Sequence, residues 1–187
     1  MKLRHLFFIA ALGLPSIPVL ALNFMPRPET QIIDDYTINY FSFEDGDRRV
    51  EYGPPNGWKC TGSPTKLTLE DPQNRQGLAV FTAIPVPKPS PFSAENLKTF
   101  KAVVQSLLPA ESQNVTITEA TGQHTIGNRE FYTANLGYVF YGQKFLVRVT
   151  FINLDKNWLQ IVCSAPTSQF EAFSKNLDSS LCSWNWK

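Results

Sequence analysis

The chain has 187 residues, a formal net charge of +1 and a charged fraction of 18%. This length suffices to bury a sizeable core in about one domain. A nearly neutral chain offers no general field for nucleic acid or an anionic membrane, and its basic residues are scattered except for the pair Arg48-Arg49. The composition therefore predicts no nucleic-acid binding.

Residues 1–21 have the pattern of a secretory signal peptide. Basic residues open the chain, and an apolar run then ends with Val19 and Ala21 in the small-residue positions of a cleavage site. We predict cleavage after Ala21, which leaves 166 residues with a net charge of −1 and no integral membrane span. An uncleaved membrane anchor is the alternative, and two prolines in the apolar run disfavour it. The signal predicts export to the periplasm or cell exterior.

The first half of the mature chain is predicted to be rich in strands. Residues 22–35 lack periodicity and contain two prolines, which predicts a flexible arm, and residues 36–187 are predicted to form one domain. Aromatic and β-branched runs predict strands at 36–43, 49–52, 58–62, 66–70 and 77–86.

A helix is predicted to follow these strands. Ser93 stands where an N-cap is expected, and Leu97, Phe100 and Val104 share one face at helical spacing. Pro109 should end the helix, because proline has no amide hydrogen and clashes with the preceding turn.

The second half is predicted to form an antiparallel meander and a second helix. Strands are predicted at 114–119, 130–141, 144–153 and 158–163. Gly142-Gln143 is predicted to form a two-residue hairpin turn. Ser168 and Glu171 match a capping box for a helix whose apolar face carries Phe170, Phe173, Leu177 and Leu181. The whole pattern predicts an α+β fold.

The chain has three cysteines, and an oxidising compartment would allow one disulfide. Cys163 alternates with apolar residues in a predicted strand, so we interpret it as a buried apolar side chain. The remaining pair, Cys60 and Cys182, is the predicted disulfide. No histidine motif accompanies a cysteine, which disfavours a catalytic thiol.

No residue is assigned a catalytic, cofactor-binding or metal-binding role. His124 is the sole histidine after the signal, and its place between Gly122 and Gly127 predicts a solvated turn. Nucleophile elbows and phosphate-binding glycine loops are absent from the sequence. An acidic group could hold calcium, but its spacing does not match a calcium loop: Asp34, Asp35, Glu44, Asp45 and Asp47. Carboxylates gathered from distant parts of the chain stay open as a catalytic alternative.

Aromatic residues make up 13% of the chain. Most suit a core, but six could instead line a surface that binds a partner: Tyr36, Tyr40, Tyr138, Tyr141, Trp184 and Trp186. Packing across the sheet faces is the alternative for each of them.

Several short motifs, taken in order, resemble those of Mog/PsbP-like domains, a family that includes PsbP and the periplasmic protein DcrB. The first is Pro55-Asn56-Gly57-Trp58, followed by an apolar strand, a Ser-capped helix and a meander. The last are WLQIVCSAP at 158–166 and the terminal Ser183-x-x-Trp186, so the resemblance spans residues 49–186. It implies an α/β/α sandwich, with a central antiparallel sheet flanked by helices. No functional residue of a family member carries over to this sequence.

The resemblance also implies a domain that binds other proteins and lacks a shared catalytic centre. Together with the signal, it predicts an exported, non-enzymatic binding or accessory protein whose partner is a protein of a membrane-associated assembly. Two alternatives stay open: a small hydrolase that uses gathered carboxylates, and a carrier of calcium or a small ligand.

Overall fold

The computed structural model describes residues 22–33, 36–74, 76–85, 92–124, 126–154 and 157–187. The predicted signal peptide and two members of the acidic group, Asp34 and Asp35, lie outside these residues. The described helices are α1 (Ala94–Ser106) and α2 (Thr167–Leu181). The described strands are β1 (Leu22–Ile33), β2 (Tyr36–Asp45), β3 (Arg48–Tyr52), β4 (Lys59–Ser63), β5 (Lys66–Glu70), β6 (Leu78–Pro85), β7 (Gln113–His124), β8 (Arg129–Phe140), β9 (Gln143–Asn153), β10 (Asn157–Pro166) and β11 (Asn185–Trp186).

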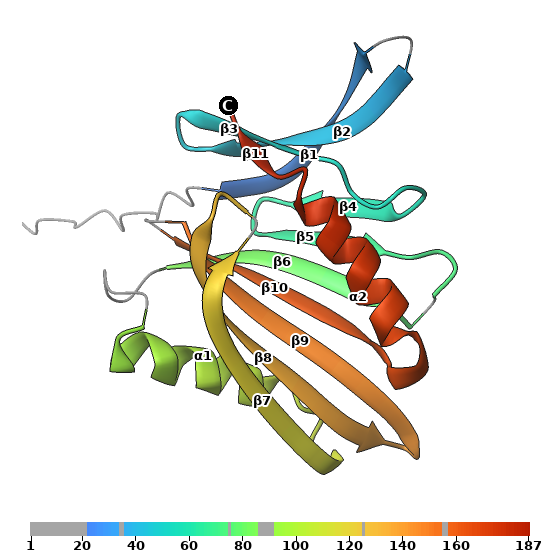
Figure 1. Ribbon diagram of the computed structural model, residues 1–187, viewed down its shortest axis with the longest axis vertical. Helices are drawn as coiled ribbons and strands as arrows, with labels where there is room; N and C mark the ends of the chain where they lie inside the picture. Colours follow the sequence, from blue (N-terminus) through green and yellow to red (C-terminus); the bar gives the residue numbers. More distant parts are fainter. Residues whose placement is uncertain (1–21, 34–35, 75, 86–91, 125, 155–156) are drawn as a thin grey trace, which may run out of the picture.

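Seven strands form a large antiparallel sheet in the order β4-β5-β6-β10-β9-β8-β7 (Figure 1). The predicted meander is confirmed, because β8 pairs with β9 and β9 with β10 along nearly their whole lengths. The apolar strand β6 pairs with β10 near the centre of the sheet, as its continuous apolar run predicts.

A second sheet has the order β1-β2-β3-β11. Its first strand occupies 22–33, where the sequence predicted a flexible arm, so that prediction was wrong for these residues. Pro26 and Pro28 are tolerated because β1 is an edge strand, and a register shift between Asn23 and Arg27 absorbs the irregularity. Leu22 and Phe24 are buried and anchor β1 on the core.

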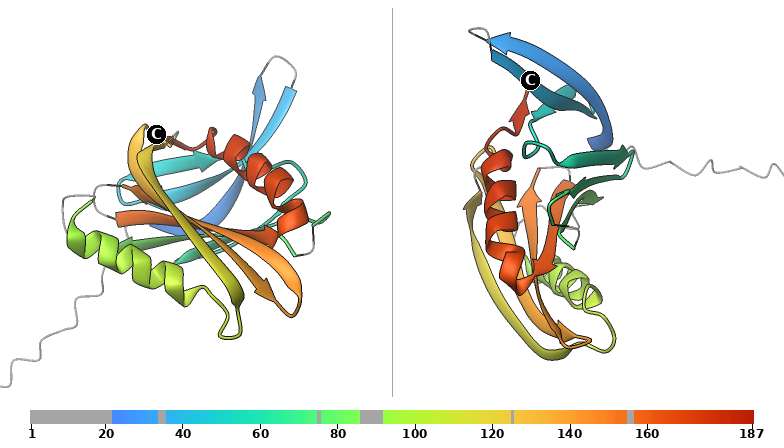
Figure 2. Two further views of the ribbon diagram at one scale, coloured as in Figure 1. Left: turned by 60° about the horizontal axis from the view of Figure 1, so that its bottom comes forward. Right: turned by 90° about the vertical axis from the view of Figure 1, so that its right-hand side faces the viewer.

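The two helices lie on opposite faces of the seven-stranded sheet (Figure 2). On the α1 side, Phe100 and Val104 pack in a cluster with apolar residues of β8, β9 and β10. On the α2 side, Phe173, Leu177 and Leu181 pack against β5, β6 and β10. The fold is thus α+β and dominated by antiparallel sheet. The predicted three-layer sandwich describes it only in part, since the second sheet shares the α2-side core.

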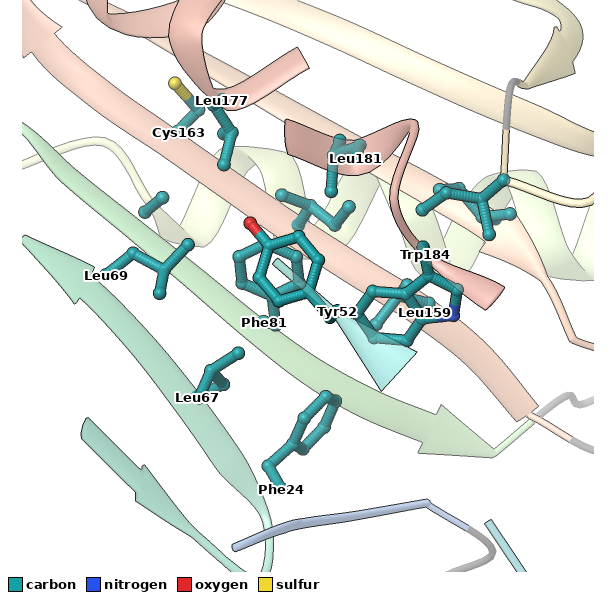
Figure 3. Packing of buried hydrophobic residues seen from close by; sticks show 14 of the residues in the cluster. Phe24, Tyr52, Leu67, Leu69, Phe81, Leu159, Cys163, Leu177, Leu181 and Trp184 are labelled. Atoms are coloured by element: carbon teal, nitrogen blue, oxygen red, sulfur yellow. The ribbon is translucent and has the colours of Figure 1, made fainter. Parts of the chain in front are cut away.

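Aromatic side chains join the two sheets. Trp184 lies 5.5 Å from Tyr52 and 6.2 Å from Phe81, measured between ring centroids. Figure 3 shows these three rings together, with Leu177 and Leu181 on the α2 side. The Tyr52 hydroxyl also forms a 2.8 Å hydrogen bond with the Ser180 hydroxyl of α2. This cluster holds the second sheet, α2 and the seven-stranded sheet together.

Local signals placed one helix cap correctly and misplaced another. Ser93 is the N-cap of α1, and its Oγ accepts a hydrogen bond from the Asn96 amide at 3.2 Å. The predicted capping box at Ser168 is wrong, because α2 starts at Thr167 with Pro166 as an N-cap that makes no side-chain bond. The residue before the helix is thus proline, whose fixed φ leads into the first turn without a side-chain cap.

The hairpin between β8 and β9 turns one residue earlier than predicted. Phe140 pairs with Gln143, which leaves Tyr141 and Gly142 as the two loop residues. Their φ angles are 46° and 77°, as a type I′ turn requires at both central positions. The sequence favoured Gly142 at the first position because glycine takes the required positive φ without steric cost.

Candidate functional site

A groove of about 590 Å³ lies between α2 and the adjacent face of the meander. Strands β7 to β10 supply its floor and one rim, and the C-terminal half of α2 supplies the other rim. The residues that line it are Gln123, His124, Phe131, Thr133, Asn135, Arg148, Thr150, Ile161, Asp178, Ser179, Leu181 and Cys182.

Strand alternation explains why this floor is polar. Side chains of successive residues point to opposite faces, so Thr133 and Asn135 share one face of β8, and Arg148 and Thr150 share the same face of β9. The intervening residues of these strands are buried against α1. Thr133 Oγ1 donates to the Val149 carbonyl at 3.0 Å and lies 3.1 Å from the Thr150 hydroxyl. The meander thus has one apolar face and one polar face.

An ion pair crosses the groove from the sheet to α2. Arg148 Nη1 donates to Asp178 Oδ2 at 3.0 Å, and Nη2 donates to the other carboxylate oxygen. The Arg148 side chain is only 23% exposed, so the pair is partly shielded from water. Two parallel hydrogen bonds fix both charges in one geometry. Among the described residues that line the groove, Asp178 is the sole carboxylate.

His124 is the last residue of β7, not part of a solvated turn, so that prediction was wrong. It pairs with Arg129 in the β-ladder, because the strand continues five residues past its predicted end. His124 Nδ1 accepts a hydrogen bond from the Ile126 amide at 3.1 Å, and the ring meets Phe131 edge-on. Burial is the main cause that lowers the pKa of His124, and Arg148 acts in the same direction while Asp178 opposes it. The imidazole is therefore neutral at pH 7.

We expect this burial to make stability depend on pH. The neutral native imidazole takes up a proton less readily than the unfolded one, so the free energy of unfolding should fall as the pH drops through the unfolded pKa of about 6.5. His124→Asn keeps an acceptor for the Ile126 amide and removes the titration. Urea unfolding at pH 7.5 and 5.5 should show a smaller loss of stability for this variant than for the wild type. Equal losses would contradict the assignment.

The three cysteines carry free thiols, and the predicted Cys60–Cys182 disulfide is not formed. Cys60 packs against the core, where burial raises its pKa to about 11. Cys182 is exposed and faces the groove, beside Asp178 of the same helix end. Cys163 is 1% exposed and belongs to the core, and burial raises its pKa to about 12.

The candidate aromatic surface does not form one patch. Trp184 is only 5% exposed and belongs to the core, while Trp186 Nε1 donates to Asp45 at 2.9 Å. Tyr138 stacks on Phe145 in the β8–β9 hairpin. Two further members lie apart from each other: Tyr40 in the second sheet, hydrogen-bonded to Glu29, and Tyr141 at the hairpin turn, 83% exposed. The side chain of Tyr36 lies outside the description.

Two described members of the acidic group, Glu44 and Asp45, form ion pairs in the second sheet. Glu44 pairs with Arg27, and Asp45 pairs with Arg48 at 2.9 Å. Within the described part of the chain, no three His, Cys, Asp or Glu residues gather in a way that could hold a metal ion.

Sequence reasoning missed the Arg148–Asp178 pair, whose members lie 30 residues apart. The sequence carried a signal for one member of the pair. Arg148 is a lone charge within the apolar run of β9, which indicates a strand position that faces away from the apolar core. Nothing local identifies Asp178 as its partner.

We expect the Arg148–Asp178 pair to contribute about 1 kcal/mol of coupling to stability, more than an exposed pair because of its bidentate, partly shielded geometry. A double-mutant cycle with Arg148→Gln and Asp178→Asn in urea measures it. The Lys59–Glu70 pair is the control, since its side chains are 72% and 50% exposed and its atoms lie 3.6 Å apart. Equal coupling in the two cycles would contradict the expectation.

No protein-family model and no curated protein matches the sequence. Among solved structures, the fold is similar to cyanobacterial PsbP (CyanoP) from Synechocystis sp. PCC 6803, with 14% identity and a TM-score of 0.51 over 94% of this chain and 99% of that one. It is also similar to LpqN of Mycobacterium tuberculosis, a protein involved in cell envelope biogenesis, with 10% identity and a TM-score of 0.47 over 83% and 89% of the chains. Only the first score reaches the level of a shared fold. Neither α1 nor α2, the helices of the described part, is long and apolar enough to cross a membrane.

The agreement with CyanoP covers nearly the full length of both chains. It includes the segment from Pro55-Asn56-Gly57-Trp58 through α1 and the meander, which contains the motifs that resemble those of Mog/PsbP-like domains. This chain therefore has a PsbP-like fold.

Proposed function

We propose that this protein is an exported, non-enzymatic binding protein that holds a segment of a partner protein in the groove between α2 and the meander. The signal-peptide pattern supports export to the periplasm or cell exterior. The PsbP-like fold is compatible with an accessory protein, and we place the partner in an assembly at the membrane. Fold alone does not determine function, so the proposal rests on the chemistry of the groove.

The chemistry of the groove supports binding over catalysis. Its carboxylate, guanidinium and imidazole are already engaged: Asp178 holds Arg148, and His124 Nδ1 accepts a hydrogen bond from the Ile126 amide. The pair carries no net charge and His124 is neutral at pH 7, so the groove favours no strongly charged ligand. The engagement of these three groups is the observation that carries the proposal.

The remaining lining matches a peptide backbone. Gln123 and Asn135 are exposed, and their amides can donate to carbonyls and accept from N–H groups. Phe131 and Leu181 supply apolar walls in the same groove. A volume of about 590 Å³ falls within the usual range of ligand sites, which is about 300–1,000 Å³. The groove is thus sized for a few residues of an extended chain.

Site-specific photocrosslinking in cells tests this proposal. A photoreactive amino acid at Asn135 reports on the groove, and the same residue at Lys98 on α1 serves as a matched exposed control. We expect position 135 to capture one reproducible envelope protein that position 98 does not, and Asp178→Ala to weaken the capture. Identical captures at both positions would refute the groove as the binding site. A purified protein that turned over a substrate, and lost that activity on substitution of His124 or Asp178, would refute the non-enzymatic role.

A further inference from the structure

Strand β7 forms one edge of the seven-stranded sheet, beside the outer strand of the meander (Figure 1). It spans twelve residues, and its side chains from Gln113 to Thr121 are all exposed. No strand of the described residues pairs with its outer side. The opposite edge, β4, is instead covered by β1, where the Phe24 amide donates to the Pro64 carbonyl at 3.4 Å. One long edge of this sheet is therefore open.

This edge lacks the charges and prolines that usually protect open strands, and its register shift between Gln113 and Thr116 lies at the start of the strand. Natural edges carry lysine, proline or inward-pointing charges that prevent pairing with another chain. The β7 sequence QNVTITEATGQH contains neither Lys, Arg nor Pro. Its single carboxylate, Glu119, accepts from the Tyr132 hydroxyl at 2.8 Å and pairs with Lys101 at 3.3 Å. The charge is thus held by neighbouring groups of the same chain, and the backbone stays available.

A hollow flanks β7 on each face of the sheet. On the α2 side lies the groove already described, which Gln123 and His124 line. On the α1 side, a hollow of about 400 Å³ is lined by Lys101, Val104, Gln105, Ile117 and Glu119. Side chains of a strand added beside β7 would point alternately to the two faces. Each set would therefore meet a hollow.

The two faces of β7 differ in chemistry. Ile117 pairs with Leu136, which is buried against α1, and Ile117 itself is 42% exposed. Thr118 pairs with Asn135 of the groove, and the next residues on that face are small, Ala120 and Gly122. A strand that fits here has apolar residues towards α1, where Val104 and Ile117 lie, and small neutral polar residues towards α2.

We infer that β7 is a strand-addition site for an extended segment of a partner protein with this alternating pattern. The inference rests on the proposed function and names the form in which the partner binds. Backbone hydrogen bonds along β7 supply affinity, and the two hollows supply specificity for alternate side chains. A second copy of this chain fits less well. Its own β7 carries Glu119 and Thr121 on the same face as Ile117, so it lacks the row of apolar residues towards α1.

Binding of a defined probe tests the site. The probe is a fluorescent twelve-residue peptide of alternating valine and serine with terminal lysines, and the control peptide has the same composition in two blocks. We expect the full mature chain to bind the alternating peptide at least tenfold more tightly, with slower hydrogen exchange of the β7 amides. Ile117→Lys should weaken binding at least tenfold. Ile38→Lys is the matched control, because Ile38 is 45% exposed on β2, and it should change binding less than twofold.

Ala120→Lys is a second variant on the other face of β7, and it should also weaken binding. Thermal unfolding of each variant separates a binding effect from misfolding. Equal affinity for the two peptides, or equal effects of Ile117→Lys and Ile38→Lys, would overturn the inference. So would a wild-type dimer in sedimentation that Ile117→Lys dissociates, since the occupant would then be a second copy.

The two proposals fail separately. If peptide binding depends on Ile117 and position 135 captures no protein, the groove is refuted as the binding site and β7 stands as a strand-addition site. If Ile117→Lys leaves the capture from position 135 unchanged, β7 is refuted as a strand-addition site and the groove stands as the binding site.

Discussion

Replacing Trp184 by alanine is expected to lower the free energy of unfolding by about 3–5 kcal/mol. The side chain is 5% exposed and its ring lies within 6.2 Å of four other aromatic rings, measured between centroids: Phe43, Tyr52, Phe81 and Trp186. Phe43 and Tyr52 belong to the second sheet, whereas Phe81 belongs to the seven-stranded sheet. Truncation leaves a cavity where the sheets meet, so the loss affects both.

Urea unfolding followed by circular dichroism measures this effect. Trp184→Phe should cost less, because it keeps a ring in the cluster and removes an indole N–H that has no hydrogen-bond partner in the described structure. Tyr141→Ala is the surface control, since this side chain is 83% exposed and should change stability by less than about 0.5 kcal/mol. If Trp184→Ala behaves like Tyr141→Ala, the tryptophan does not hold the sheets together.

Trp184 also shows where sequence reasoning reached its limit. A tryptophan near the end of a chain, flanked by Ser183 and Asn185, carries no local sign of burial. Its position in the core depends on α2, which brings the end of the chain back to the second sheet, and on β11, which pairs with β3. Contacts between residues so far apart in sequence leave no periodic pattern.

Elements with local signals were predicted well. The run of β6, the alternation of β8 to β10 and the Ser93 cap of α1 each follow from a few neighbouring residues. β1 was missed because its two prolines indicated a flexible arm. In the structure β1 pairs with β2 on one side only, and prolines are tolerated in such an edge strand. The groove was missed for a similar reason. The alternation in β8 and β9 shows that one face is polar, but not that α2 stands across from it.

Substituting Gly62 by alanine is expected to cost about 3 kcal/mol and to loosen β1. A Cβ at this position would lie 2.0 Å from the Phe24 carbonyl oxygen and 2.3 Å from Pro26 Cδ. These atoms belong to the backbone and ring of β1, which cannot rotate away as a flexible side chain can. The β1 backbone must therefore move off β4, and the buried Phe24 must move with it.

Two measurements separate this outcome from a general loss of stability. In Gly62→Ala, hydrogen exchange should accelerate in β1 and β2 before it does so in β8 to β10. Only the second sheet loses its close contact with β4. Gly53→Ala is the matched control: its added Cβ would meet Ser183 Oγ at 3.5 Å, an ordinary contact, and should leave stability within about 0.5 kcal/mol of the wild type. Uniform acceleration across both sheets would mean that the contact of β1 with Gly62 does not hold the second sheet in place separately. Localised acceleration would show that one glycine sets how closely the two sheets approach each other.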